Sequence, residues 1–294
     1  MNKWLGIEEF VAVAKRGNFK LAAEYLGQST SHVSRAVMGL EDRIHAPLFF
    51  RSTRQVTLTD TGRALFEQCR QLVDDRDEAL AMVTGSGEPQ GELRVTCSMS
   101  MGERFIAPIL LRYAEQFPNV SVSIHLTNRI IDLTSEGFDL AIRTGYLDDS
   151  KLVVTRIASR RLILCAAPEY LEKHGRIDSI ADLENHNCLA GTSTHWRFKV
   201  DGSEVSWLPK GRWRCNSGVA VRDAALSGMG LCQLPEFYVA DYLKSGKLVH
   251  VLETESRVFE PIWAVCPERR HLLPKVTRLL DLLKSDKALK GEGV

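Results

Sequence analysis

Two helices joined by a short turn near the N-terminus constrain this chain more than any other feature. Lys20 to Leu26 carries apolar residues at helical spacing, and Gly27 then breaks the helix. Ser29 is placed to cap a second helix, in which apolar residues recur every three or four positions and form one buried stripe. The stripe consists of Val33, Val37, Leu40 and Ile44. This spacing predicts a helix-turn-helix.

The opposite face of the second helix is polar. A rotation of ~100° per residue places Ser31, Arg35 and Met38 on the solvent side, with His32 and Ser34 at its edges. The major groove of DNA admits a helix, and hydroxyl, imidazole and guanidinium groups can form hydrogen bonds with base edges and phosphates. We therefore predict DNA contacts for Ser29, Thr30, Ser31, His32, Ser34, Arg35 and Met38.

A strand-like segment from Leu48 to Leu58 follows, with a polar hairpin in its middle. Arg51 and Arg54 of this hairpin are placed to contact the phosphates that flank the groove, as the wing of a winged helix does. Seven Lys or Arg stand against three acidic residues between positions 15 and 54, a net charge of +4, whereas the whole chain carries only +1. Positive charge is thus concentrated in this region, as DNA binding requires. A helical interaction domain with a solvated basic face is the alternative.

A long helix is predicted from about Thr59 to Val83. Thr59 can cap it, and Asp60 favours its positive N-terminal end. Successive positions on one side of this helix are separated by alternating steps of three and four residues, as a coiled-coil seam requires. These positions are Phe66, Cys69, Val73, Arg76, Leu80 and Val83. The predicted dimerisation residues are Phe66, Cys69, Val73, Leu80 and Val83. A dimer would present two recognition helices to a roughly palindromic site, although the helix could instead pack only on its own chain.

A glycine-rich linker, Gly85 to Gly91, marks the predicted domain boundary. Beyond it the pattern changes to alternating strands and helices. Strands are expected over 92–97, 120–127, 139–143, 162–167, 249–252 and 262–265, and helices over 102–117 and 217–228. Such alternation predicts a mainly parallel sheet covered on both faces.

Three polar segments lie where strands end or helices begin, the positions at which such sheets bind ligands. The candidate effector-binding residues are Ser98, Met99, Ser100, Thr127, Asn128, Asn216 and Ser217. Their hydroxyl and amide groups favour, weakly, a small carboxylate or another anion. The alternative for each is ordinary, since serine and asparagine at helix starts commonly serve as caps.

Several function classes find no support. The seven cysteines include no Cys-x-x-Cys pair and the eight histidines show no metal spacing, so we expect no disulfide framework, no metal and no cofactor, with a redox switch between distant cysteines left open. Nucleophile-elbow, P-loop and dinucleotide motifs are absent, so an enzyme is not expected. No apolar run approaches ~20 residues, and the N-terminus lacks a secretory signal, which predicts a cytoplasmic protein.

The N-terminal segment resembles the DNA-binding domain of LysR-type transcriptional regulators. The residues that carry the likeness are Phe19, Ala22, Ala23, Glu24, Leu26, Ser29, Val33, Ser34, Arg35, Leu40, Glu41, Pro47, Leu48, Phe49, Arg51, Arg54, Leu58, Thr59 and Gly62. Asn18 stands where the family usually has serine, and Thr30-Ser31-His32 stands where it often has Gln-Pro-Ala. The operator sequence is therefore not predictable by analogy.

Later segments resemble the LysR effector domain: 91–95, 117–120, 138–145 and 225–230. The resemblance implies two α/β lobes around a cleft, as in periplasmic binding proteins, joined by crossover strands near 162–167 and 262–267. Arg143 lies within one of these motifs. Its guanidinium could clamp a carboxylate bidentately, or pair with Asp139 or another acidic residue to hold the lobe together. Since the family motif treats this arginine as part of a structural signature, we favour the structural role.

The predicted fold class is α/β with an N-terminal all-α winged helix-turn-helix, a long linker helix and a two-lobed periplasmic-binding-protein-like effector domain. The DNA-binding domain is placed at 1–62, the dimerisation helix and hinge at 63–90 and the effector domain at 91–294, with lobe I at about 91–164 and 267–294 and lobe II at about 165–266.

The predicted function is sequence-specific transcriptional regulation of the LysR type, controlled by an effector bound between the lobes. The expected partners are double-stranded DNA, a small-molecule effector, a second copy of the chain in a homodimer or homotetramer, and RNA polymerase. The alternative is a winged-helix protein-docking module fused to an α/β catalytic or solute-binding domain.

Overall fold

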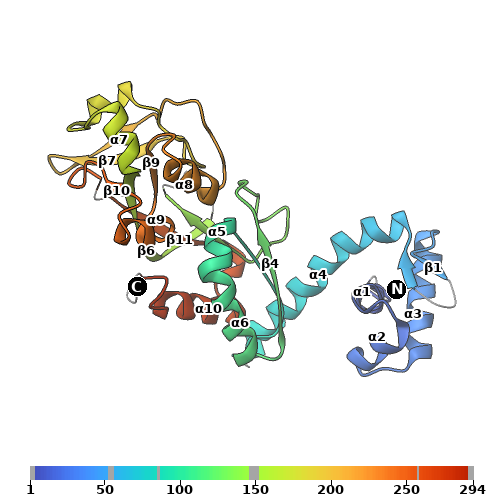
Figure 1. Ribbon diagram of the computed structural model, residues 1–294. Coiled ribbons are helices and arrows are strands. Elements are labelled where there is room, and N and C mark those ends of the chain that lie inside the picture. Colours follow the sequence, from blue (N-terminus) through green and yellow to red (C-terminus); the bar gives the residue numbers. More distant parts are fainter. Residues whose placement is uncertain (1–3, 52–55, 85–86, 146–151, 257, 291–294) are drawn as a thin grey trace. The chain divides into compact units, whose positions relative to one another are not determined.

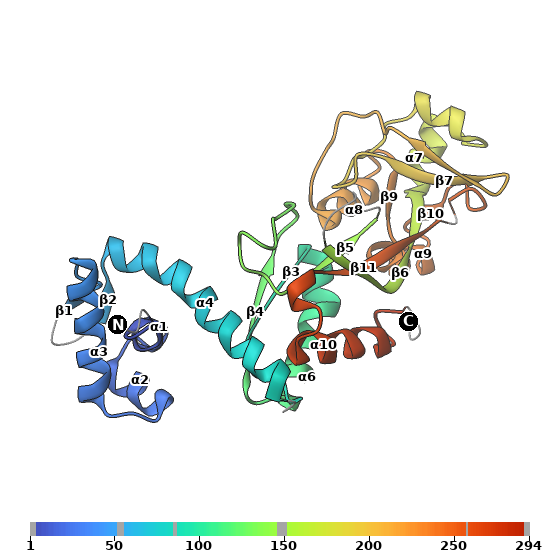
Figure 2. The same cartoon turned by 180° about the vertical axis from the view of Figure 1, so that it is seen from behind.

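The computed structural model describes residues 4–51, 56–84, 87–145, 152–256 and 258–290 (Figures 1 and 2). Two compact units divide the chain, Met1–Gly91 and Glu92–Val294. The long helix that we placed in a segment of its own therefore belongs to the N-terminal unit.

The N-terminal unit consists of helices and one small antiparallel sheet. Its elements are α1 (Ile7–Arg16), α2 (Phe19–Leu26), α3 (Thr30–Ile44), β1 (Phe49–Arg51), β2 (Val56–Leu58) and α4 (Asp60–Thr84). The Asn18 side chain caps α2 by accepting hydrogen bonds from the backbone N–H groups of Lys20 and Leu21, so asparagine here does what serine does at an N-cap. Gly27 ends α2 with a φ of 63°, the left-handed conformation that favours glycine. The predicted turn between the two helices is present.

The buried stripe of α3 is shorter than we predicted. Val33, Val37 and Leu40 are buried in the core of the unit, as their spacing indicates. Ile44, in contrast, is 36% exposed. It is the last residue of α3, and the chain turns away at His45, which has a φ of 53°. The buried stripe of α3 therefore ends at Leu40, and Ile44 lies beyond the core of the unit.

Helix α4 packs on its own unit. Cys69 and Val73 lie in the same core as the α3 stripe, and the Phe66 ring packs edge-on against Phe10 at a centroid distance of 6.5 Å. Cys69 and Val73 of the predicted seam are thus buried within their own unit, and Phe66 is partly buried there, so the seam with a second chain stays a prediction. The predicted residue Leu80 is 58% exposed, whereas the side chain of Val83 lies outside the described part.

Two ion pairs join α4 to α1. Arg76 donates two hydrogen bonds to the Glu8 carboxylate, at 2.8 and 2.9 Å, and its guanidinium lies 5.7 Å from the Trp4 ring centre. Lys15 Nζ contacts Asp74 Oδ1 at 2.9 Å. The hydrogen bonds from Arg76 lower the pKa of Glu8, so this carboxylate stays charged at neutral pH.

The C-terminal unit alternates strands and helices. Its first part comprises β3 (Gly91–Cys97), α5 (Met99–Met101), the π-helical turn η1 (Gly102–Ile106), α6 (Ala107–Gln116), β4 (Val120–Leu126), β5 (Leu140–Thr144) and β6 (Leu152–Ala166). Its second part comprises α7 (Pro168–His174), η2 (Ile180–Asn185), β7 (Trp196–Val200), β8 (Ser203–Trp207), α8 (Gly218–Leu226), β9 (Cys232–Pro235), α9 (Glu236–Lys244), β10 (Val249–His250), β11 (Val258–Pro267), η3 (Glu268–Arg270) and α10 (Pro274–Ser285).

One mixed sheet runs through this unit, in the strand order β10-β6-β11-β5-β3-β4, with β9 also paired to β6. Strands β3 and β5 are parallel, with Cys97 opposite Ile142. Strand β11, however, is antiparallel to both β5 and β6, and β6 is antiparallel to β9 and β10. The prediction of a mainly parallel sheet is therefore wrong. The chain leaves the first lobe along β6 and returns along β11, and two adjacent passes in opposite directions are antiparallel.

Separate cores define the two lobes. The first core gathers β3, α6 and α10, with Val95, Tyr113 and Leu279 among its members. Two further clusters form the second lobe, one around Ile163 and the other around Leu164. Figures 1 and 2 show β6 and β11 side by side, passing from one lobe to the other.

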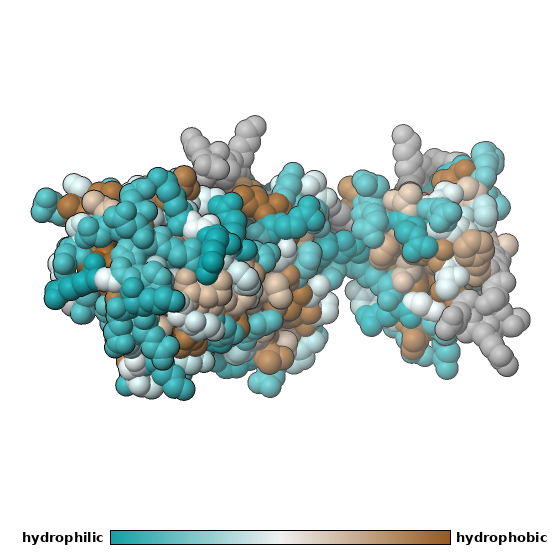
Figure 3. All heavy atoms as spheres, turned by 45° about the horizontal axis from the view of Figure 1, so that its top comes forward, coloured by the Kyte–Doolittle hydropathy of each residue, from teal (hydrophilic) through white to brown (hydrophobic). Residues whose placement is uncertain are grey.

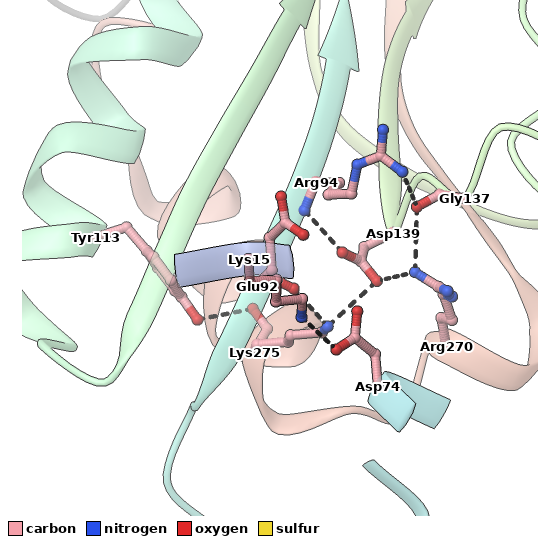
Figure 4. Close-up of polar contacts among 9 residues, drawn as sticks. All are labelled: Lys15, Asp74, Glu92, Arg94, Tyr113, Gly137, Asp139, Arg270 and Lys275. Atoms are coloured by element: carbon pink, nitrogen blue, oxygen red, sulfur yellow. Dashed lines mark hydrogen bonds and ion pairs between the residues drawn. The ribbon is translucent and has the colours of Figure 1, made fainter. Parts of the chain in front are cut away.

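A buried carboxylate ties the end of the chain to the first lobe (Figure 4). Asp139, 1% exposed, accepts a hydrogen bond from the backbone N–H of Arg94 at 2.7 Å and forms ion pairs with Arg270 and Lys275. Lys275 Nζ also donates to the Glu92 carbonyl oxygen at 2.7 Å. The network holds η3 and α10 against the strands β3 and β5.

Candidate DNA interface and effector site

The start of α3 is a capped, exposed and polar helix end. The Ser29 hydroxyl oxygen accepts a hydrogen bond from the His32 N–H at 3.2 Å and lies 3.1 Å from the Ser31 hydroxyl oxygen. The structure places the predicted DNA-binding residues of this helix on one surface. Those exposed are Ser29, Thr30, Ser31, His32, Arg35 and Met38, and Ser34 is partly exposed.

The longer side chains of this surface are only partly engaged. Arg35 Nε donates to the Ser31 carbonyl oxygen at 3.2 Å, and within the described residues this is the one hydrogen bond of the Arg35 guanidinium. His32 Nε2 lies 3.6 Å from Glu9 Oε1. The helix therefore presents hydroxyl, imidazole and guanidinium donors from its first two turns, the part of a recognition helix that meets base edges.

The wing is described only at its base. Strand β1 ends at Arg51, opposite Val56 of β2. The Arg51 side chain and all of Arg54 lie outside the described residues, so their predicted contacts stay predictions. Behind the wing, the Thr59 hydroxyl accepts from the Gly62 N–H at 2.9 Å and donates to the Pro47 carbonyl oxygen at 2.7 Å. A Cβ at Gly62 would lie 2.1 Å from the Leu48 carbonyl oxygen, so only glycine fits there.

The predicted effector residues come together across the two lobes. Asn128, after β4, accepts through Oδ1 from the Met99 N–H at 3.3 Å. The Asn128 amide nitrogen donates to the Asn216 carbonyl oxygen at 2.8 Å. Thr127 continues β4 by donating its N–H to the Cys97 carbonyl oxygen at 2.8 Å. Segments more than eighty residues apart in sequence thus share one hydrogen-bonded cluster.

Two residues of this cluster were missed by sequence reasoning. The Thr192 hydroxyl donates to the Asn216 carbonyl oxygen at 3.2 Å. The Tyr238 hydroxyl forms a hydrogen bond with the Ser100 hydroxyl. Thr192 lies in an irregular loop and Tyr238 on α9, so no local pattern indicates a shared site. A Cβ at Gly218 would lie 2.3 Å from the Tyr238 ring, which explains a glycine at this position.

The Ser217 hydroxyl is the N-cap of α8. It accepts a hydrogen bond from the Ala220 N–H at 3.4 Å, so the cap alternative describes what this side chain does here. Met99 is 49% exposed and Val219 is 45% exposed, so apolar side chains flank the polar cluster. Figure 3 shows brown hydrophobic patches among the teal hydrophilic surface on the face in view.

Arg143 does not pair with Asp139. The Asp139 carboxylate is bound by Arg270, Lys275 and the Arg94 N–H, all on other elements. The Arg143 Nη2 atom is buried and has no hydrogen-bond partner. Burial lowers the pKa of Arg143. Of the partners considered for a structural Arg143, Asp139 is therefore excluded.

Three buried cysteines are unsuited to nucleophilic chemistry. Burial raises the pKa of Cys97 and Cys188 to about 12 and that of Cys266 to about 11, whereas a reactive cysteine needs a lowered pKa. Cys165 and Cys232 lie opposite each other on β6 and β9, with their sulfur atoms 3.6 Å apart. Across the described residues, no group of histidine, cysteine and acidic side chains could hold a metal. No helix in the same residues is long and apolar enough to cross a membrane.

A family model for the LysR substrate binding domain matches residues 86–288. The chain belongs to the LysR family of transcriptional regulators. The helix-turn-helix of lysR-family regulatory proteins matches residues 6–63, which contain α1 to β2. As a LysR-type regulator, the chain is a DNA-binding protein with an effector-binding domain.

Curated relatives match along most of their length. The regulator CrgA of Neisseria meningitidis is 32% identical over 84% of this chain and 84% of its own. The activator TtdR of Escherichia coli K12 is 31% identical over 91% of this chain and 89% of its own. Both are transcriptional regulators by name, which favours regulation over the docking and catalytic alternative.

Solved structures show the same fold. The structure of CrgA from Neisseria meningitidis has a TM-score of 0.55 at 30% identity, covering 95% of this chain and 98% of that one. The full-length structure of the Vibrio cholerae virulence activator AphB has a TM-score of 0.58 at 24% identity, covering 95% and 97%. The predicted fold class is confirmed.

Proposed function

We propose that α3 reads a specific operator with its first two turns. The observation that carries this proposal is the exposed polar surface at the start of α3, fixed by the Ser29 cap. Ser31, His32 and Arg35 are assigned to base edges, and Arg51 and Arg54 of the wing to phosphates. Ser29, Thr30, Ser34 and Met38 complete the interface. Base contacts give sequence preference, whereas phosphate contacts give affinity for any DNA.

The effector site is assigned to the cluster that joins the lobes. Ser98, Met99, Ser100, Thr127 and Asn128 line it from the first lobe, and Asn216 and Ser217 line it from the second. A small molecule bound here would compete for the Asn128 and Ser100 hydrogen bonds, which link the lobes, and so would alter the relative stability of their arrangements. A small carboxylate or another anion is the proposed ligand class.

Self-association is assigned to the exposed face of α4. Among the described side chains of α4, Leu72 and Leu80 are large apolar groups that are 51% and 58% exposed, and Val83 follows them in sequence. Burying such residues against a second copy is favourable. In this proposal the protein is a homodimer or homotetramer. It acts on promoters in the cytoplasm together with RNA polymerase.

The test is selection of DNA by the purified full-length protein. Genomic fragments are retained on the protein at a stated salt concentration and sequenced. Enrichment of discrete, roughly palindromic sites near promoters is expected. Fragments no more enriched than random DNA, across a range of salt and with folded protein, would overturn specific recognition.

A further inference from the structure

Arg143 is a partly buried cation at the effector end of the sheet. It lies at the end of β5, beyond Ile142, which pairs with Cys97 at the end of β3. Because these strands are parallel, Arg143 leaves the sheet at the same edge and level as Ser98, the first candidate effector residue. The Arg143 Nη2 atom is buried without a hydrogen bond.

The carboxylate of the adjoining strand is already bound by another arginine. Glu260, on β11, accepts from Arg160 Nε at 2.7 Å, and Arg160 Nη2 also donates to the Thr144 hydroxyl at 3.0 Å. Opposite Arg143 on β11 stands Trp263, whose indole N–H donates to the Gly145 carbonyl oxygen at 2.6 Å. Among the described residues, no carboxylate therefore forms an ion pair with Arg143.

Thr96 provides a second polar group without a partner. It is fully buried, and its hydroxyl makes no hydrogen bond. Thr96 pairs with Ala141, two residues before Arg143, so alternation along the strands places Thr96 and Arg143 on the same face of the sheet. Diagonal neighbours on such a face have backbones about 7–8 Å apart, so one small group can contact both side chains.

Both groups lower the stability of the folded protein unless a ligand forms hydrogen bonds with them. A guanidinium stays protonated, so burial leaves a charge that needs compensation, and a buried hydroxyl without a partner also destabilises the fold. The buried cations Arg270 and Lys275 of this lobe, in contrast, form ion pairs with Asp139. Two polar groups without partners on one face of the sheet are what a ligand with hydrogen-bonding oxygens would satisfy.

We propose that Arg143 and Thr96 recognise the charge of the effector, and that this effector is a small carboxylate. The planar guanidinium donates two parallel hydrogen bonds to the carboxylate, and the Thr96 hydroxyl donates to one of its oxygens. The rest of the molecule extends toward Ser98 and Ser100. This assignment rests on the proposed effector site and adds its charge-recognising residues, which lie outside the cluster that bridges the lobes.

The first test needs no ligand. Arg143→Met and Arg270→Met each remove one buried guanidinium from the full-length chain, and thermal unfolding is followed in chloride buffer without other anions. Arg270→Met should lower the Tm by roughly 6 °C or more, because it leaves buried Asp139 with Lys275 as its remaining ion-pair partner. Arg143→Met should keep the Tm within about 2 °C of wild type or raise it. A loss as large as that of Arg270→Met would show that Arg143 is a structural ion-pair residue and would overturn the proposal.

The second test titrates anions on the full-length protein. Sodium acetate, succinate and citrate are compared with sulfate and phosphate at constant ionic strength, again by thermal unfolding. At least one carboxylate should raise the Tm by about 3 °C or more at ten times its Kd. Arg143→Met should abolish this rise and Thr96→Val should reduce it.

Three outcomes would overturn the proposal: no carboxylate shifts the Tm, the variants respond like wild type, or only sulfate and phosphate act. DNA selection with the same preparations separates these failures from failure of the proposed function. Specific DNA binding without a carboxylate response would reject the Arg143 site alone.

Discussion

At the scale of single residues, the buried charge of Asp139 is paired, whereas a buried nitrogen of Arg143 has no hydrogen-bond partner. Asp139 is fully buried and holds three donors from different elements. We expect Asp139→Asn to lower the free energy of unfolding of the C-terminal unit by about 3–5 kcal/mol, because Arg270 and Lys275 lose their counter-charge. Urea unfolding of the full-length chain measures this loss.

Asp178→Asn is the matched control, since the Arg176–Asp178 pair is exposed on both sides. It should change the free energy of unfolding by less than about 0.5 kcal/mol. Equal losses for the two variants would contradict the structural role of the Asp139 network.

His186 gives a pH dependence whose sign follows from its surroundings. Burial is the main cause that lowers its pKa, and the charge of nearby His174 adds to this effect. The folded state therefore binds a proton less readily than the unfolded state, whose histidine has a pKa of about 6.5. Stability is complete above that pH and falls as the pH drops below it.

We expect the Tm of the C-terminal unit to decline between about pH 7.5 and pH 5.5, and His186→Gln to reduce this decline. Thermal unfolding in a pH series measures both. A decline of the same size in wild type and variant would assign it to other groups.

At the scale of elements, one face of α4 packs into the core of the N-terminal unit, and another face is exposed. Val73→Ala should lower the stability of the N-terminal unit by about 2 kcal/mol, because Val73 is buried in the core of the unit. Leu80→Ala should leave that stability nearly unchanged, since Leu80 is 58% exposed. If this face holds a second copy, Leu80→Ala should instead weaken self-association.

Sedimentation velocity and thermal unfolding of both variants separate these effects. A Leu80→Ala protein with wild-type association would remove Leu80 from the proposed interface. A Val73→Ala protein of wild-type stability would contradict the packing of α4.

The elements that sequence reasoning predicted best are those with local causes. Gly27 and Ser29 fix the turn between α2 and α3 through their own backbone and side-chain groups. Periodicity shows that a helix buries one face, but it does not show what covers that face. The seam was assigned to a second chain, whereas Cys69 and Val73 pack into the core of their own unit. Strand direction is likewise absent from local patterns, which is why the antiparallel passes of β6 and β11 were missed.

The candidate effector site was predictable only in part, for the same reason. Ser98 and Asn128 stand at strand ends, a position that a general rule for α/β sheets identifies. Tyr238 reaches Ser100 from 138 residues away in sequence, and no pattern in α9 indicates this contact. Arg143 was identified as a candidate, but its partner could not be chosen until the structure showed that Asp139 is bound elsewhere.

At the scale of the whole molecule, the two units divide recognition between them. The N-terminal unit presents a polar helix end, and the C-terminal unit brings strand ends of one lobe to loops of the other. Regulation requires that ligand binding in one unit alter the DNA affinity of the other, and such coupling is reciprocal. A carboxylate that binds at Arg143 should therefore change operator affinity by the same factor by which operator DNA changes carboxylate affinity.

The central claim is that the first turns of α3 read DNA sequence, and Arg35→Ala tests it most directly. Affinities for a selected operator and for random DNA are measured by fluorescence anisotropy at one fixed salt concentration. Arg176→Ala, which removes an exposed charge from the other unit, is the control. Operator affinity of Arg35→Ala should fall roughly tenfold or more, with a smaller change on random DNA. Unchanged operator affinity, or an equal fall on both DNAs, would contradict the account.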